Sequence, residues 1–278
     1  MRLDAAIADA TSRLAETSES ARLDAEILLC QTIDMPRSYL FAHPEDELDE
    51  LTRDRFENLM RRRIDGEPMS YITGTREFWS HKLMVSPATL VPRPETELLV
   101  DLALREIPQD ADWRILDLGT GSGAIAISIA AERLLCDVVA TDSSAAALAV
   151  AAENVRQANL ANVACVLGSW AEPVADQQFS VIVSNPPYVR DDDEALQLLQ
   201  HEPISALASG EDGLDDIRIL ATSCIPILAA GGWLMMEHGS DQSDAVADIL
   251  TAASWTEITC HNDLAGLPRV TVARRDVT

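Results

Sequence analysis

The chain has 278 residues, of which 47% are hydrophobic, and it carries a formal net charge of −25. This length and apolar content allow a substantial core in one large or two ordinary domains. The charge argues against a protein whose main partner is the nucleic acid backbone, and no stretch is apolar over the length that a membrane span needs. The acidic excess is greatest from residue 106 onward, where 26 acidic residues accompany 8 basic ones.

The cysteines are odd in number and widely scattered, at positions 30, 136, 165, 224 and 260. That pattern is typical of reduced, buried thiols and not of a disulfide framework or a zinc site. The five histidines show no ligand spacing, so we expect no metal. The N-terminus lacks the basic-then-apolar pattern of a signal peptide. We therefore expect a cytoplasmic protein with no membrane association.

The first part of the chain predicts a helical domain over residues 1–70. Apolar residues recur at helical spacing over 4–15, 21–33 and 47–64. The third helix ends in Arg61-Arg62-Arg63 followed by Gly66, which is ordinary chemistry for a helix C-terminus. The same arginines could instead grip a partner protein or nearby RNA, and the sequence leaves both interpretations open.

Residues 71–90 mix aromatic and β-branched residues and predict a β-hairpin that links two domains. The proline-framed segment Val91–Glu97 follows and leads into a helix through about Ile107. Arg93 and Glu97 in this segment are candidates for shaping a substrate pocket. The alternative, left open, is that they brace the domain junction.

From Trp113 onward, predicted strands alternate with predicted helices. The strands are 113–118, 137–142, 163–167, 179–184 and 232–238, and the helices are 122–135, 144–158, 214–229 and 241–253. Such alternation predicts an α/β fold with a mostly parallel sheet covered by helices on both faces. Two last strands, at 255–261 and 268–274, have a short connection at Gly266 and predict an antiparallel hairpin at the sheet edge.

A glycine-rich loop follows the first of these strands, in Asp117-Leu118-Gly119-Thr120-Gly121-Ser122-Gly123. Glycines at alternate positions allow a sharp turn and a close approach of a ligand. The next strand ends at Asp142, whose carboxylate is placed to accept the hydroxyls of an adenosine ribose. Gly119, Gly121 and Ala124 also satisfy the dinucleotide fingerprint, so from the loop alone an NAD-linked oxidoreductase is a rival.

The strand at 179–184 ends in Asn185-Pro186-Pro187-Tyr188. The two prolines lack N–H donors and leave carbonyls that can only accept, while Asn185 adds an amide oxygen and Tyr188 a flat ring. Acceptors beside an aromatic face suit a planar group that carries an NH2. The alternative is a proline-rich turn without a ligand.

Three features favour S-adenosylmethionine over a dinucleotide. The third glycine is Gly123, Asp117 offers a carboxylate near a cationic amino-acid tail, and the acceptor cluster at Asn185 has no evident use in a dehydrogenase. Trp170, after the third strand of the alternating region, supplies an aromatic group at the expected height of adenine.

Together these motifs resemble the class I S-adenosylmethionine-dependent methyltransferases and, more closely, the release-factor glutamine N5-methyltransferases, known as HemK or PrmC. The matching segments run in family order over nearly the whole chain, after a helical N-terminal region as the family has. They are Val91–Glu97, Asp117–Gly123, Asp142, Ser169–Trp170, Asn185–Tyr188, Glu202–Pro203, Gly213–Leu214, Asp263–Gly266 and Arg269–Val270.

The resemblance implies a Rossmann-like methyltransferase domain over residues 91–278, with the helical domain recognising the substrate. It implies that the cofactor site is lined by Gly119, Thr120, Gly121, Ser122, Gly123, Asp142, Trp170 and Asn185. It also implies that Asn185, Pro186, Pro187 and Tyr188 bind the acceptor, the glutamine of the Gly-Gly-Gln loop of class-1 peptide chain release factors. We expect a monomer with no direct nucleic acid requirement.

The chain departs from the family pattern at Glu77–Ser80 and at Met236–Gly239, and both departures are expected to be peripheral to methyl transfer. The run Asp191–Glu194 could be a catalytic carboxylate cluster, but acids before a helix N-terminus are the simpler interpretation. Three rivals stay open: an amino-methyltransferase acting on adenine or guanine, one acting on a ribosomal-protein glutamine, and a cofactor-binding regulatory module.

Overall fold

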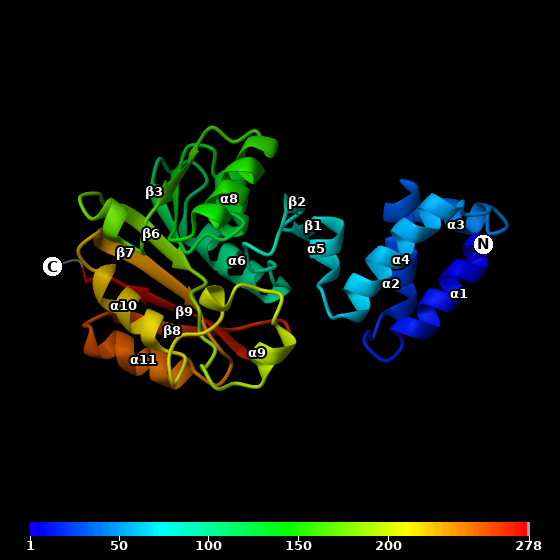
Figure 1. The fold of residues 1–278 in the computed structure, drawn as a ribbon. Helices are drawn as coiled ribbons and strands as arrows, with labels where there is room; N and C mark the ends of the chain where they lie inside the picture. The colour runs from blue at the N-terminus through cyan, green and yellow to red at the C-terminus, as the bar shows by residue number, and fades with distance from the viewer. Residues whose placement is uncertain (277–278) are drawn as a thin grey trace. The chain divides into compact units, whose positions relative to one another are not determined.

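The computed structural model describes residues 1–276, which divide after Thr75 into two compact units (Figure 1). The first unit is helical and packs around one apolar cluster that includes Leu14, Leu28 and Phe56. Its helices are α1 (Leu3–Leu14), α2 (Ala21–Ile33), α3 (Arg37–Ala42), α4 (Glu50–Ile64) and α5 (Met69–Thr73). The three longest helices are those that the apolar spacing predicts.

The structure differs from the sequence prediction at three places in this unit. Helix α4 begins at Glu50 and not at residue 47, because the Asp49 side chain accepts the Thr52 N–H at 2.7 Å and caps the helix there. Helices α3 and α5 were not predicted, since each is too short to show a helical period. Helix α5 takes up residues expected in the hairpin and stops at Gly74, which has φ +74°.

The second unit begins with a two-stranded hairpin and continues into a seven-stranded sheet. The hairpin strands are β1 (Thr75–Phe78) and β2 (His81–Met84). The remaining elements are η1 (Pro94–Thr96), α6 (Glu97–Glu106), β3 (Arg114–Leu118), α7 (Ala124–Glu132), β4 (Asp137–Asp142), α8 (Ala145–Gln157), β5 (Val163–Leu167), η2 (Glu172–Val174), β6 (Phe179–Ser184), α9 (Ala195–Leu198), η3 (Ile204–Ala206), α10 (Asp215–Ser223), β7 (Leu228–Glu237), α11 (Ser243–Ala252), β8 (Thr256–Asn262) and β9 (Pro268–Arg274).

The sheet has the order β5-β4-β3-β6-β7-β9-β8, with parallel pairing from β5 to β7. Strand β9 runs antiparallel to both β7 and β8, so the predicted terminal hairpin is confirmed. The predicted α/β fold with a seven-stranded, mostly parallel sheet is likewise confirmed. Strand β7 starts earlier than predicted, at Leu228, because Leu228 pairs with Phe179 before a shift in register.

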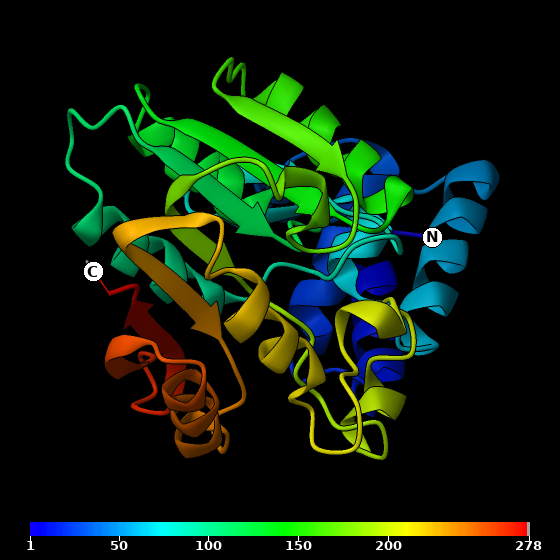
Figure 2. The same cartoon turned by 90° about the vertical axis from the view of Figure 1, so that its left-hand side faces the viewer.

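Helices cover both faces of this sheet (Figure 2). Alternate residues of each strand point to opposite faces, as the strand period requires. In β3, Ile115 packs with residues of α6, α7 and α8, whereas Leu116 packs on the opposite face with residues of α10 and α11. Each face therefore has its own apolar core, and the polar ends of the strands are left to form a site.

Strands β3 and β6 are neighbours, although the chain visits β4 and β5 between them. The sheet continues from β3 through β4 to β5 on one side of this pair, and from β6 through β7 and β9 to β8 on the other. Ligands of open α/β sheets bind beyond the carboxyl ends of the strands at such a switch point. The loops after Leu118 and Ser184 meet there. Within residues 1–276, no helix has the length and apolar character to cross a membrane.

Candidate active site

The glycine-rich loop turns from β3 into α7 with three residues in the left-handed region. Gly119 has φ +71°, Gly121 +57° and Gly123 +84°. A Cβ at Gly119 would come within 3.1 Å of the Trp170 ring, whereas one at Gly121 would meet nothing within 4 Å. The loop therefore needs glycine for its backbone, and at Gly121 it borders open space that a ligand can enter.

Asp117, at the carboxyl end of β3, is fully buried and anchors the loop to α7. Its Oδ2 accepts the Thr120 hydroxyl at 2.6 Å and the Ala126 N–H at 3.2 Å, in the first turn of the helix. Its Oδ1 has no hydrogen-bond partner among the described residues. Burial raises the pKa of Asp117 to about 7, against the lowering effect of these two hydrogen bonds. An unpaired buried carboxylate oxygen of this kind calls for a cationic partner.

Because the pKa of Asp117 is higher in the folded than in the unfolded chain, the folded protein binds the extra proton between about pH 4 and pH 7. The stability that this group contributes is complete below that window and is lost as the pH rises through it. Relative to Asp117→Asn, the wild-type free energy of unfolding should fall by up to about 1.4 kcal/mol per pH unit. Denaturant unfolding of the ligand-free proteins at several pH values would measure this difference, and parallel curves would contradict it.

Asp142 ends β4 beside the glycine loop. Its carboxylate accepts the Gly121 N–H at 2.9 Å and the Ser144 N–H at 2.8 Å. A carboxylate has about four acceptor positions, so two remain for a ligand. Trp170 lies across the loop with φ +45°, and its backbone carbonyl accepts the Thr141 hydroxyl at 3.2 Å. The structure thus places both Asp142 and Trp170, which were predicted to bind the cofactor, beside the glycine-rich loop.

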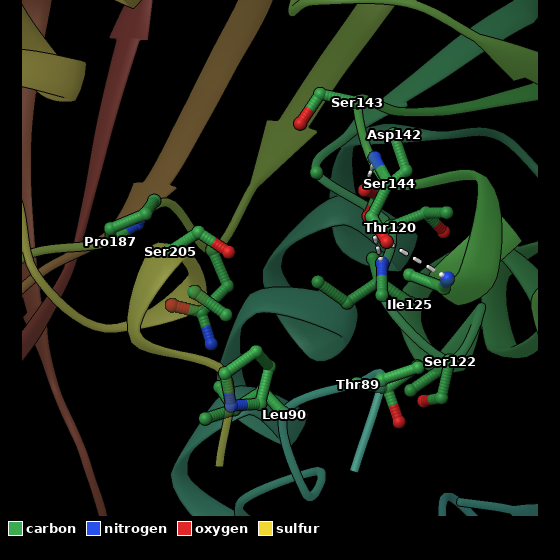
Figure 3. Close-up of a pocket in the computed structure, with 18 of the residues that line it drawn as sticks. Thr89, Leu90, Thr120, Ser122, Ile125, Asp142, Ser143, Ser144, Pro187 and Ser205 are labelled. Atoms are coloured by element: carbon green, nitrogen blue, oxygen red, sulfur yellow. Dashed lines mark hydrogen bonds between the residues drawn. The ribbon is translucent and has the colours of Figure 1, made fainter. Parts of the chain in front are cut away.

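A cavity of about 320 Å³ opens at these strand ends. Its walls include Gly119, Thr120, Gly121, Ser122, Asp142 and Trp170. In the close-up, Thr120 and Asp142 to Ser144 lie on one side, and Pro187 and Ser205 lie on the other (Figure 3). The volume lies in the range of small-molecule sites, and the mixed polar and apolar walls are typical of them.

Asn185 and Pro187, directly after β6, line the same cavity as the glycine loop. Before them, the buried Ser184 donates its hydroxyl to the Leu118 carbonyl at 2.8 Å and ties the ends of β6 and β3 together. The Asn185 NH2 group donates to the Thr96 hydroxyl oxygen at 3.2 Å, so the Asn185 Oδ1 stays available to a ligand. Pro186 is buried behind this wall. Part of the predicted acceptor motif and part of the predicted cofactor loop therefore share one cavity, whereas Tyr188, Gly123 and Asp117 are not among the residues that line it.

Tyr188 is held at three points that the sequence did not reveal. Its N–H donates to the Leu207 carbonyl at 3.1 Å, its carbonyl accepts the Gln242 side chain at 3.0 Å, and its hydroxyl donates to Glu237 at 3.2 Å. Burial raises the pKa of Tyr188, which keeps the ring neutral. Glu237, in a segment that we expected to be peripheral to methyl transfer, thus contacts the acceptor motif at Tyr188, and its part in the reaction stays a prediction.

Arg93 and Glu97 lie in different surroundings. Arg93 lines the cavity and forms an ion pair with Glu202, whose side chain is 2% exposed. Glu202 also accepts the Val91 N–H at 2.9 Å, so one buried carboxylate holds the segment at both Val91 and Arg93. Glu97 is not among the residues that line the cavity, and it accepts the Trp79 N–H at 3.0 Å within the second unit, so neither of the two roles is tested by this contact.

Replacing Arg93 with alanine would leave the Glu202 carboxylate buried without its cation. Breaking such a pair at a partly exposed arginine should cost about 2 kcal/mol in the free energy of unfolding. Urea unfolding would measure this loss. Arg105→Ala is the matched control, because its partner Asp101 is exposed and the pair should contribute less than about 1 kcal/mol. Equal losses in the two variants would contradict the assignment.

Two runs of charged residues, Arg61–Arg63 and Asp191–Glu194, contain side chains that pair with groups of their own surroundings. Arg62 pairs with Glu67, and Arg63 with the buried Asp24, so these arginines stabilise the helical unit. In the acidic run, Asp193 accepts the Ala195 N–H at the start of α9, as an acid before a helix should. None of Asp191 to Glu194 lines the cavity.

Three residues of types that can bind a metal ion lie close together in the structure, and the sequence pattern did not predict this cluster. The ligand atoms of His43, Glu45 and Asp46 lie within 4.8 Å of one another in the helical unit. They come together because α3 ends at Ala42 and the chain turns at Pro44. The Tyr39 hydroxyl donates to Asp46 at 2.6 Å, and exposed acids of this sort need no ion. The absence of a metal therefore stays a prediction.

Comparison with known proteins gives matches over most of the chain. Residues 5–74 match the family model described as PrmC N-terminal domain, and residues 95–210 match that described as methyltransferase small domain. A release factor glutamine methyltransferase of Vibrio cholerae is 45% identical, with 98% of this chain and 96% of the relative covered. Those of Coxiella burnetii and Escherichia coli are 44% and 40% identical, with coverages of 95% and 96% of this chain. Each alignment spans 96% of the relative.

Among solved structures, a methyltransferase from Pyrococcus furiosus aligns with 79% of this chain and 99% of its own length. The TM-score is 0.55 at 16% identity, so this likeness concerns the fold alone.

Proposed function

The chain belongs to the release factor glutamine methyltransferases, and on that premise we propose its reaction. It transfers a methyl group from S-adenosylmethionine to the side-chain amide nitrogen of the glutamine in the Gly-Gly-Gln motif of class-1 peptide chain release factors. One observation carries the proposal: Asn185 and Pro187 of the acceptor motif line a single cavity with residues 119–122 of the glycine loop. The relatives, 40–45% identical, support the same substrate class.

The residues of the cavity fit S-adenosylmethionine. Asp117 is not among the residues that line the cavity, but it lies directly before the loop, and its unpaired Oδ1 is suited to the cationic amino-acid end of the cofactor. The open space beside Gly121 gives a ligand room. Asp142 has acceptor positions left for the ribose hydroxyls, and Trp170 offers a flat apolar surface for the adenine. When bound, the cofactor supplies a methyl group on a positively charged sulfur.

The protein has to make a poor nucleophile react, because the lone pair of an amide nitrogen is delocalised into its carbonyl. We infer that the Asn185 Oδ1 and a carbonyl of Pro186 or Pro187 accept the two N–H bonds of the glutamine amide. They turn its lone pair toward the methyl group and stabilise the positive charge that develops on nitrogen. Tyr188 covers the amide plane. This is orientation and electrostatic preorganisation, and no strong base is required beforehand, because the methylated, positively charged nitrogen is acidic and gives up one of its two protons to water.

A substrate competition tests the proposal. The protein is incubated with S-adenosylmethionine and, in separate reactions, with a release factor, duplex DNA or ribosomal particles, and mass spectrometry locates any methyl group. We expect methylation of the Gly-Gly-Gln peptide alone. Methyl on DNA or on a ribosomal-protein glutamine, with none on that peptide, would overturn the assignment in favour of one of the rivals.

We further propose that the enzyme acts as a monomer in the cytoplasm, where peptide chains are released. The net charge of −25 supports a protein substrate that binds without help from nucleic acid.

A further inference from the structure

Asn154, in α8, is a buried residue whose side chain bonds two segments that are far apart in the sequence. It is 2% exposed. Its Oδ1 accepts the Met84 N–H at 2.7 Å, and its NH2 group donates to the Met84 carbonyl at 2.9 Å and to the Ser122 carbonyl at 2.8 Å. Met84 ends β2 of the hairpin, and Ser122 belongs to the glycine-rich loop. One side chain therefore joins the hairpin to the loop.

The orientation of the Asn154 amide is fixed by its three partners. All of them are backbone groups, so the N–H can only donate and the two carbonyls can only accept. Only one of the two orientations of the amide satisfies all three. With Met84 it exchanges two hydrogen bonds, as a residue of a neighbouring antiparallel strand would. The complete pairing of this buried side chain shows that the connection is specific.

The segment after β2, residues 85–93, forms part of the cavity wall, and we call it the strap. Its residues Thr89 and Leu90 line the cavity, as does Ser122 of the glycine-rich loop. In the close-up, these three residues lie along the lower edge of the cavity (Figure 3). Because Asn154 bonds both Ser122 and the residue just before the strap, it fixes the separation of these two parts of the wall.

The strap has a separate attachment at its other end. There the Glu202 carboxylate bonds Val91 and Arg93. Glu202 directly precedes Pro203, which lines the cavity, and the nearby Ser205 lies on the same side as Pro187 of the acceptor motif (Figure 3). The strap is therefore tied to the glycine-rich loop at its start and to the acceptor side of the cavity at its end.

We propose that Asn154 is a positioning residue for the cofactor, because it fixes the strap against the glycine-rich loop. The proposal rests on the proposed function, which places S-adenosylmethionine in this cavity. A ligand that contacts two segments binds more weakly when their separation is not fixed, since binding must then order the segments as well. Asn154 is not among the residues that line the cavity, so it acts through the two segments that it joins.

Calorimetry on the full chain with S-adenosylhomocysteine, the demethylated cofactor, tests the proposal. Asn154→Ala removes all three bonds and should raise the dissociation constant at least tenfold. Asn154→Asp keeps an acceptor for the Met84 N–H but has no donor for the two carbonyls, so it should raise the constant at least as much. In methylation assays the KM for S-adenosylmethionine should rise in parallel, whereas kcat at saturating cofactor should stay within about threefold.

Asn162 provides a matched control. Its NH2 group donates to the backbone carbonyls of Ala130, Arg133 and Cys136 at 3.0–3.3 Å, and it does not line the cavity. Asn162→Ala should lower the midpoint of urea unfolding, as Asn154→Ala does, but leave the dissociation constant unchanged. Equal weakening of cofactor binding in the two variants would overturn the proposal, as would an unchanged constant in both Asn154 variants.

A measurement on the wild-type protein covers the case in which the Asn154 variants do not fold. Coupling is reciprocal, so a cofactor that depends on the Asn154 bonds must slow their opening by the same factor. Hydrogen exchange at the Met84 N–H should therefore slow at least tenfold when S-adenosylhomocysteine saturates the protein, and more than exchange at the Cys136 N–H. Equal slowing at both positions would show only global stabilisation and would overturn the proposal. Failure of the proposed function would appear separately, as a wild-type protein that binds the cofactor without methylating the release factor.

Discussion

Replacing Asn185 with alanine is expected to abolish methyl transfer while leaving the affinity for S-adenosylmethionine within about tenfold, or about 1.4 kcal/mol. The variant removes the amide oxygen that would accept an N–H of the glutamine. Removing one preorganised group of this kind typically lowers turnover by about 10² to 10³-fold. The variant leaves Asp117, Asp142 and Trp170 in place, so the affinity for the cofactor should persist.

Single-turnover methylation of a release factor and calorimetry with S-adenosylmethionine would separate the two effects. Asn262→Ala is a suitable control, because Asn262 is exposed on β8, away from the cavity. A complete loss of cofactor binding in Asn185→Ala would instead assign Asn185 to the cofactor. Retained turnover would show that the acceptor amide is oriented by the proline carbonyls alone.

Replacing Asp142 with alanine is expected to weaken cofactor binding by about 100-fold. Hydrogen bonds to a charged group contribute about 1.5–3 kcal/mol each, and Asp142 would supply two to the ribose. It also accepts the Gly121 and Ser144 N–H groups, so the variant loses the loop conformation that receives the ligand. Turnover at saturating cofactor should change much less than affinity.

Asp142→Asn keeps one acceptor oxygen and should give an intermediate dissociation constant. Calorimetry with S-adenosylhomocysteine, which is not consumed, provides the measurement for both variants. An unchanged dissociation constant in Asp142→Ala would show that the carboxylate serves the loop and not the ribose.

The sequence predicted the parts of the site that lie on regular elements. Each strand of the parallel sheet showed its apolar run, and the glycines and prolines after β3 and β6 marked where those runs end. Because the carboxyl ends of parallel strands meet at one edge, the strand pattern alone was enough to place Asp142 and Asn185 near the glycine loop. The short helices α3 and α5 were missed because five or six residues show no period.

The residues that hold the site could not be predicted, because their partners are remote in the sequence. Glu202 reaches Val91 across 111 positions, and Gln242 reaches Tyr188 across 54. Nothing in the sequence distinguishes a buried glutamate that links two loops from an ordinary exposed glutamate at the end of a strand. The contact of Glu237 with the Tyr188 hydroxyl was missed for this reason, because only the fold brings the two residues together.

The direct pairing of β3 with β6 has a mechanical consequence. Two adjacent strands lead into the loop that would hold the methyl donor and into the motif that would hold its acceptor. These strands are joined at Leu118 and Ser184 by backbone pairing and by the Ser184 hydroxyl. Neighbouring strands keep a spacing of about 4.8 Å. The distance between the loop and the motif, which the methyl group would cross, is thus set by two hydrogen-bonded strands in the middle of the sheet. Fraying at the outer strands β5 and β8, where local opening is easiest, would leave that distance unchanged.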